Sequence, residues 1–195
     1  MLTLFYGLVL FLGVHLLQVL APGWRERRRA QWGALTYKGI YSVVSLLGFV
    51  LLVHGYGLAR AEPVPLWQPP RGLMHLAWLL MWLAMVLMVA AYFPRNGIRR
   101  RLGHPMTLSV KVWAFSHLLV NGNLADVLLF GSFLVWAVLV FRSARRRPVS
   151  AAAQAPASTL ATLLTALLGS ALWALFLWGG WHAQWIGVDP LGAAG

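Results

Sequence analysis

The chain of 195 residues contains no cysteine and only four acidic residues, and charged residues make up 10% of it. The absence of cysteine excludes a disulfide scaffold, a zinc or iron–sulfur site held by thiolates, and a cysteine nucleophile. So little charge is unusual for a soluble domain, in which about a quarter of the residues are charged. An intrinsically disordered chain is also excluded, because 60% of the residues are hydrophobic.

The charge that is present has mostly one sign. Sixteen Lys and Arg against four Asp and Glu give a formal net charge of +12. A protein this basic either binds nucleic acid or carries its charges in the cytoplasmic loops of a membrane protein. Here the arginines stand in short loops between apolar stretches, and no nucleic-acid-binding motif is present. We therefore expect contact with a lipid bilayer and its anionic headgroups, and no nucleic acid.

Six apolar stretches follow one another and predict an all-α, polytopic membrane protein, a bundle of about six transmembrane helices. They are Leu2–Ala21, Tyr37–Ala59, Leu73–Phe93, Met106–Val120, Leu124–Phe141 and Leu160–Trp181. A span needs about 20 apolar residues, so Met106–Val120 is the weakest of the six. The Asn-Gly-Asn turn before Leu124 predicts a hairpin between two antiparallel helices.

Most of the basic residues fall in alternate loops, which are those after the first, third and fifth stretches. By the positive-inside rule these loops face the cytoplasm, and both termini lie outside it. The pattern predicts a multi-pass membrane protein whose basic loops lie in the cytoplasm. We interpret residues 1–195 as a single integral-membrane domain, with a flexible cytoplasmic linker at about 148–158 that is rich in Ala, Ser and Pro.

Histidines within the spans are the first candidates for function, because ionisable groups in a bilayer are costly and usually functional. His15 and His117 each lie at least a turn inside an apolar stretch. His75 lies in the first turn of the third stretch, and His104 stands where it could cap the start of the fourth. Without cysteine, neutral imidazole is the strongest ligand for a soft or borderline metal. Chemistry alone leaves helix–helix hydrogen bonding and haem binding between two helices both open.

Other polar and polarizable residues have plainer interpretations. His182 stands among tryptophans at the expected outer interface, and His54 lies near a helix end. Met81, Met85 and Met88 form a stripe at helical spacing, which is typical of core packing. The alternative for this stripe is a pocket for a flat or long apolar small molecule.

Several segments taken together resemble the NnrU family of bacterial membrane proteins. They are Phe11–His15, Tyr37–Ser42, Gly103–Met106, Ser116–Gly122 and Asn123–Gly131. The resemblance covers about residues 1–145 and, less closely, the last span. That family is linked to nitrite and nitric oxide metabolism in denitrifying bacteria, so the resemblance implies a multi-pass protein of the bacterial inner (cytoplasmic) membrane. It is similar to 15-cis-zeta-carotene isomerase, a membrane enzyme that uses haem b.

The resemblance implies haem b as a cofactor. His15 matches a histidine in the first span of the isomerase, and His104 and His117 match its His-Pro motif and a histidine thirteen residues later. His75 also matches. The resemblance thus implies His15 and His117 as iron ligands, or groups that fix them, with His75 and His104 as further cofactor-binding residues. A further isomerase histidine implicated in haem ligation has no counterpart here, in residues 133–137.

With haem bound, the resemblance implies isomerase-like action on a polyene, or a redox or nitric-oxide-related activity. A non-enzymatic membrane sensor or assembly factor linked to denitrification is the alternative. It needs only the topology and a few packing histidines, and would work with a protein partner or as a homo-oligomer. A membrane methyltransferase using S-adenosylmethionine is the third interpretation, since His104-Pro105 follows an arginine run. The residues that follow, Thr107–Ser109, differ from the aromatic residue and glycine of those enzymes.

Overall fold

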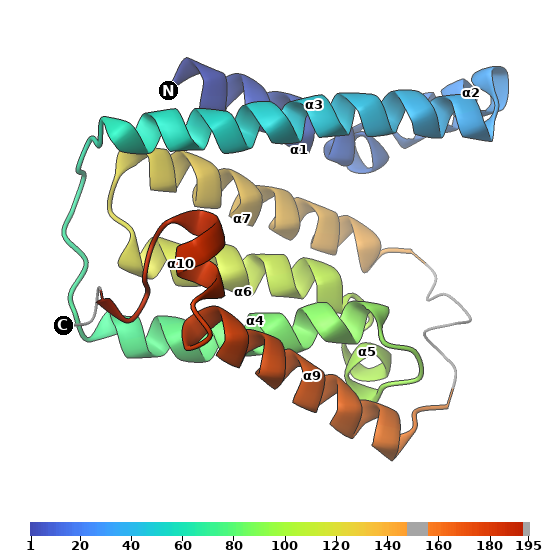
Figure 1. Cartoon of the computed structure of the whole chain (residues 1–195). Coiled ribbons are helices and arrows are strands. Elements are labelled where there is room, and N and C mark those ends of the chain that lie inside the picture. The colour runs from blue at the N-terminus through green and yellow to red at the C-terminus, as the bar shows by residue number, and fades with distance from the viewer. Residues whose placement is uncertain (148–155, 193–195) are drawn as a thin grey trace. The chain divides into compact units, whose positions relative to one another are not determined.

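Helices dominate the computed structural model, which describes residues 1–147 and 156–192 (Figure 1). They are α1 (Leu2–Leu20), α2 (Pro22–Trp32), α3 (Ala34–Ala61), α4 (Leu73–Tyr92), α5 (Gly97–Leu102), α6 (Pro105–Val120), α7 (Leu124–Ala144), α9 (Thr159–Leu177) and α10 (Trp181–Ile186). The predicted linker at about 148–158 lies outside the described residues as far as residue 155.

Among the residues that the structure describes, five helices are long and apolar enough to cross a membrane: α1, α3, α4, α7 and α9. The prediction of an all-α, polytopic membrane protein is therefore confirmed. Helix α6 has 16 residues, which is short for a span of about 20, and it carries Lys111. The ammonium of Lys111 lies 4.0 Å from the ring centroid of Phe141, a cation–π contact. The count of six spans and the side on which the termini lie stay predictions.

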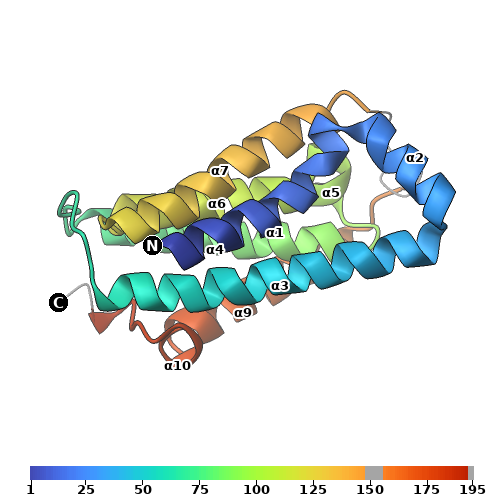
Figure 2. The same cartoon turned by 90° about the horizontal axis from the view of Figure 1, so that it is seen from above.

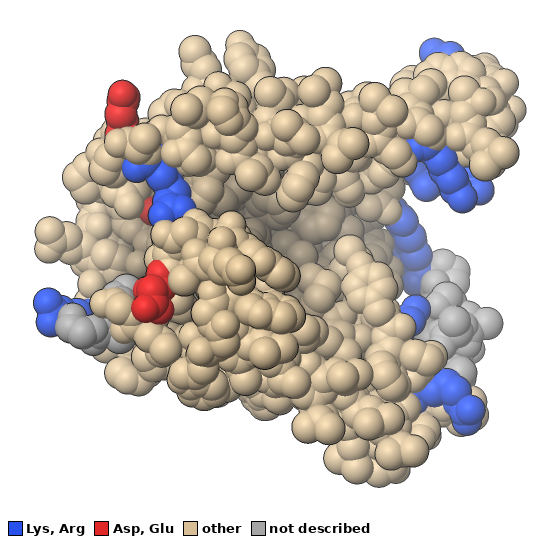
Figure 3. All heavy atoms as spheres, in the orientation of Figure 1, with Lys and Arg blue, Asp and Glu red and all other residues tan. Residues whose placement is uncertain are grey.

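The apolar helices keep much of their side-chain surface exposed. Leu35 is 86% exposed and Val43 is 67% exposed, and only 17% of the apolar window of α9 is buried. The face drawn in Figure 3 shows wide surfaces without charge between basic and acidic groups. Soluble proteins rarely expose apolar patches larger than a few hundred Å². These helix faces are therefore in contact with lipid.

Two segments expected as loops are largely helical. Arginines and other helix-forming residues occupy α2 and α5, and Pro22 stands at the first turn of α2, where its missing N–H costs nothing. The side chain of Asn96 caps α5 by accepting from the amide of Arg99 at 2.7 Å. The charge of these segments predicts a side of the membrane but no backbone conformation.

The described chain divides into two compact units. Unit 1 comprises Met1–Gln68 and Asn121–Val140, and unit 2 comprises Pro69–Val120 and Phe141–Gly195. Helices α1, α2, α3 and most of α7 belong to unit 1, whereas α4, α5, α6, α9 and α10 belong to unit 2.

In unit 1, α1 and α3 form an antiparallel pair, and glycines lie where the two backbones are closest (Figures 1 and 2). At three positions a Cβ would collide with the backbone of the partner helix. The contacts are Gly7 with Leu52, Gly48 with Phe11 and Gly55 with Leu4. Small residues let helix backbones approach closely in lipid, where no hydrophobic effect drives helices together.

In unit 2, two serines join α6 to α4. The Ser109 hydroxyl donates to the carbonyl of Ala84 at 2.7 Å, and the Ser116 hydroxyl donates to that of Ala77 at 2.9 Å. Both pairs of positions are seven residues apart, so the bonds repeat along one antiparallel seam. Helix α9 also contacts α4, where a Cβ on Gly169 would collide with the α4 backbone.

Candidate functional site

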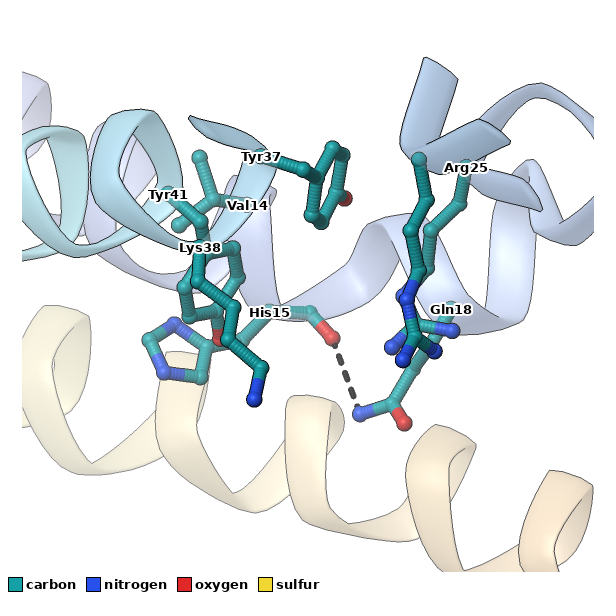
Figure 4. A pocket seen from close by; sticks show the side chains of 8 residues that line it. Val14, His15, Gln18, Arg25, Tyr37, Lys38 and Tyr41 are labelled. Atoms are coloured by element: carbon teal, nitrogen blue, oxygen red, sulfur yellow. Dashed lines mark hydrogen bonds between the residues drawn. The ribbon is translucent and has the colours of Figure 1, made fainter. Parts of the chain in front are cut away.

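A cavity of about 260 Å³ lies in unit 1 where the end of α1, the arginine-rich α2 and the start of α3 meet (Figure 4). The lining residues are Val14, His15 and Gln18 from α1, Arg25 and Arg29 from α2, and Tyr37, Lys38 and Tyr41 from α3. On each helix these positions are three, four or one residue apart, so that each helix presents one face to the cavity. We call this cavity the His15 pocket.

The wall of the His15 pocket is strongly basic. Arg25, Arg29 and Lys38 contribute positive charge, and none of the described lining residues is acidic. The amide of Gln18 and two tyrosine hydroxyls add hydrogen-bonding groups. In Figure 4 the Lys38 and Arg25 side chains extend toward Gln18, which itself donates to the backbone carbonyl of His15 at 3.3 Å. The arrangement suits an anionic group.

His15 forms the boundary between this basic wall and a group of aromatic rings. Its Nδ1 lies 2.6 Å from the carbonyl oxygen of Phe11. A carbonyl only accepts hydrogen bonds, so Nδ1 is the donor, and in the neutral ring Nε2 is the nitrogen with the lone pair. The imidazole centroid lies 4.5 Å from the ring of Phe11, 5.3 Å from that of Tyr41 and 6.2 Å from that of Trp136. The buried indole N–H of Trp136 has no hydrogen-bond partner among the described residues.

His117 and His182 form a second histidine arrangement, in unit 2. Their rings stack with centroids 6.4 Å apart and planes 22° apart. Nδ1 of His117 donates to the carbonyl of Trp113 at 2.9 Å, and Nδ1 of His182 donates to that of Val188 at 2.7 Å. As in His15, Nδ1 of each ring is the donor, so that Nε2 is the acceptor nitrogen when the ring is neutral.

From the sequence, His182 is expected only at the outer interface, and its contact with His117 is not predicted. The short helix α10, which carries His182, lies between Gly180 and Gly187, and both glycines adopt left-handed conformations, with φ of 73° and 77°. These glycines were the available signal that the chain turns sharply on both sides of His182. The two glycines do not predict which helix His182 contacts after the turn.

The two remaining candidates, His75 and His104, have aromatic contacts in unit 2. The His75 ring meets that of Trp78 edge-on at 5.0 Å, and the His104 ring meets that of Phe141 edge-on at 6.3 Å. Helix α6 begins directly after His104, whose carbonyl accepts from the hydroxyl of Thr107 at 3.1 Å. His104 therefore stands at the helix start, as its position before a proline predicts.

The candidate ligands are distributed over both units. His15 belongs to unit 1, whereas His75, His104 and His117 belong to unit 2. Across residues 1–147 and 156–192, no group of three or more histidines and carboxylates is placed to hold a metal ion. The pairing of His15 with His117 on one iron atom stays a prediction.

Comparison with known proteins gives one assignment. The family model described as NnrU protein matches residues 3–190. No curated protein and no solved structure matches the chain, so the similarity to carotene isomerase stays a prediction. The family match includes the His15 pocket and every candidate histidine. On this evidence the chain belongs to the NnrU family.

Proposed function

We propose that this NnrU protein binds haem b in the bacterial inner membrane, with Nε2 of His15 as an iron ligand. The observation that carries the proposal is the hydrogen bond from Nδ1 of His15 to the carbonyl of Phe11. Histidines that ligate metals usually donate the other ring N–H to a carbonyl or carboxylate, which fixes the tautomer and makes the ligand more basic.

The surroundings of His15 fit a haem in their chemistry. The aromatic rings of Phe11, Tyr41 and Trp136 suit a flat apolar macrocycle, and the unpartnered indole N–H of Trp136 is a donor that a ligand would satisfy. The basic wall of the His15 pocket suits the two propionates.

The size of the pocket limits what it can enclose. Its volume of about 260 Å³ is smaller than the range of about 300–1,000 Å³ that is typical of small-molecule sites. The His15 pocket as it stands would therefore take the acidic edge of a haem and not the whole macrocycle.

A bound haem would supply an iron centre whose reactivity depends on the residues that hold it and on the polarity around it. His15 would hold the iron through Nε2, Arg25 and Lys38 would offset the charge of the propionates, and the apolar helices would keep water away. A centre of this kind supports the redox, nitric-oxide-related or isomerase-like activities that we propose for it.

An absorption spectrum of the protein purified from haem-replete cells tests this proposal. We expect a Soret band that is abolished or shifted by His15→Ala and unchanged by His54→Ala. His54 is a matched control because it is an exposed histidine on the neighbouring helix α3. His117→Ala and His182→Ala would show whether either ring supplies the second ligand.

Failure to show a Soret band, even with added hemin, would overturn haem binding. The remaining candidates would then be a non-enzymatic sensor or assembly factor, detected by a stable protein partner in pull-down experiments, and a methyltransferase, detected by calorimetric binding of S-adenosylmethionine.

A further inference from the structure

We infer that the His15 pocket binds the anionic group of a membrane amphiphile, either a phosphate or a carboxylate. This inference stands on the shape and charge of the pocket and does not depend on iron ligation by His15. Two sources carry this chemistry, the headgroup of an acidic phospholipid and the propionate edge of a haem.

The arginines of α2 lie in two environments, the wall of the pocket and a pair of tryptophan rings. Arg25 and Arg29 are four residues apart, share one face of α2 and line the pocket. Arg28 instead lies over the rings of Trp24 and Trp32, at 5.8 and 5.5 Å from their centroids, and donates to the side chain of Gln31 at 3.0 Å. The positive-inside rule explains basic residues in this segment, but it does not require any of them to converge on one cavity.

The partners of these arginines in the pocket are also suited to an anion. Lys38 brings a third positive charge from α3, and the ring of Tyr37, which is only 8% exposed, forms part of the wall. Guanidinium groups bind phosphate and carboxylate oxygens through paired hydrogen bonds, whereas an ammonium acts as a compact point charge. Three cations without an acidic lining residue leave the pocket with an uncompensated positive field.

The surroundings indicate an amphiphile and not a soluble anion. The pocket lies at one end of α1 and α3, two helices that are apolar enough to span a membrane. Val14 lines the pocket, and Ile40 and Val43 on α3 are 47% and 67% exposed. A ligand with its acid group among the cations could therefore lay an apolar part along helix surface that already faces lipid.

The test uses the full chain, purified without haem and reconstituted with equal amounts of phosphatidylglycerol and phosphatidylcholine. Native mass spectrometry then measures which lipid stays bound. We expect preferential retention of phosphatidylglycerol by the wild type. Arg29→Gln should weaken this retention about fivefold and the double variant Arg25→Gln/Arg29→Gln about 25-fold, since a basic residue near an anionic membrane surface contributes about a factor of five.

Arg27→Gln is the matched control, because it removes the same charge from the same helix but Arg27 is not among the residues that line the pocket. Equal losses in Arg27→Gln and Arg29→Gln would overturn the inference, since they would indicate a diffuse surface charge. If the double variant does not fold, Lys38→Gln replaces it, and an unchanged retention in Lys38→Gln and Arg29→Gln would also overturn it.

A parallel experiment with hemin identifies the source of the anionic group. Hemin is added to the same variants in phosphatidylcholine alone, and its retention is measured. Loss of hemin in Arg29→Gln but not in Arg27→Gln, with no lipid preference, would support the pocket with a haem carboxylate as its ligand. Lipid retention is measured without haem, so a missing Soret band would refute the proposed function and leave the phospholipid result unaffected.

Discussion

The hydroxyl of Tyr56 on α3 donates a hydrogen bond of 2.6 Å to Oδ1 of Asp126 on α7, joining two helices of unit 1 across 70 positions of the chain. Asp126 is 3% exposed, and its other oxygen accepts from the backbone and side-chain amides of Asn123, at 3.2 and 3.1 Å. Gly122, just before this turn, accepts from the amides of Leu66 and Trp67 in the proline-rich loop that follows α3. Asp126 is therefore a satisfied structural carboxylate that ties α7 to α3.

Replacement of Tyr56 by Phe tests this connection. We expect it to destabilise the protein by about 2 kcal/mol, because the change removes a hydrogen bond to a charged group and leaves a buried acceptor without that donor. Unfolding in mixed detergent measures the change. Tyr6→Phe serves as the control, since Tyr6 is 58% exposed on α1. A similar loss in both variants would contradict the structural role of the Tyr56–Asp126 bond.

The close glycine contacts between α1 and α3 lead to a second prediction about stability. Gly55→Leu should cost about 3 kcal/mol or prevent folding, because even a Cβ at Gly55 would collide with the α1 backbone. Gly57→Leu on the same helix should be tolerated, since a Cβ at Gly57 meets nothing within 4 Å. Size-exclusion chromatography and thermal unfolding would distinguish the two. Equal tolerance of both variants would show that α1 and α3 are not in close backbone contact.

The two serine hydrogen bonds between α4 and α6 in unit 2 should contribute less to the free energy of unfolding than the glycine contacts do. Ser109→Ala and Ser116→Ala are each expected to cost about 0.6 kcal/mol, the average measured for side-chain hydrogen bonds between membrane helices. The two bonds lie seven residues apart, so we expect their effects to be additive. Ser42→Ala, at an exposed position of α3, is the control for unfolding measurements. A double variant as stable as the wild type would contradict the contribution of these bonds.

Topology is tested separately from stability. The distribution of basic residues predicts that a reporter fused after Gly195 is active only outside the cytoplasm. A cytoplasmic signal from this fusion would contradict the six-span count, and the short helix α6 would be the first span to reconsider. A second reporter placed at Gly33, between α2 and α3, should give the opposite result.

The candidate site was only partly predictable from the sequence. The hydrogen bonds from Nδ1 of His15 and of His117 go to carbonyls four residues earlier, so they are local consequences of the helix. The bond from His182 to Val188 and its stacking on His117 depend on how the chain turns at two glycines. Helix α2 is not predicted from the sequence, because the arginines of this segment indicate only a side of the membrane.

By itself, the sequence determined the membrane class, the helical architecture, the family and the histidines worth testing. The length of an apolar run, the placement of charge and the absence of cysteine are local or compositional properties, and each constrains the chain without knowledge of its neighbours. Only the tertiary structure decided that Arg25, Arg29 and Lys38 share a pocket with His15, and that Asp126 binds Tyr56. These relationships depend on how α1, α2, α3 and α7 pack together, and no single segment encodes that packing. Close glycine contacts set the register of α1 against α3.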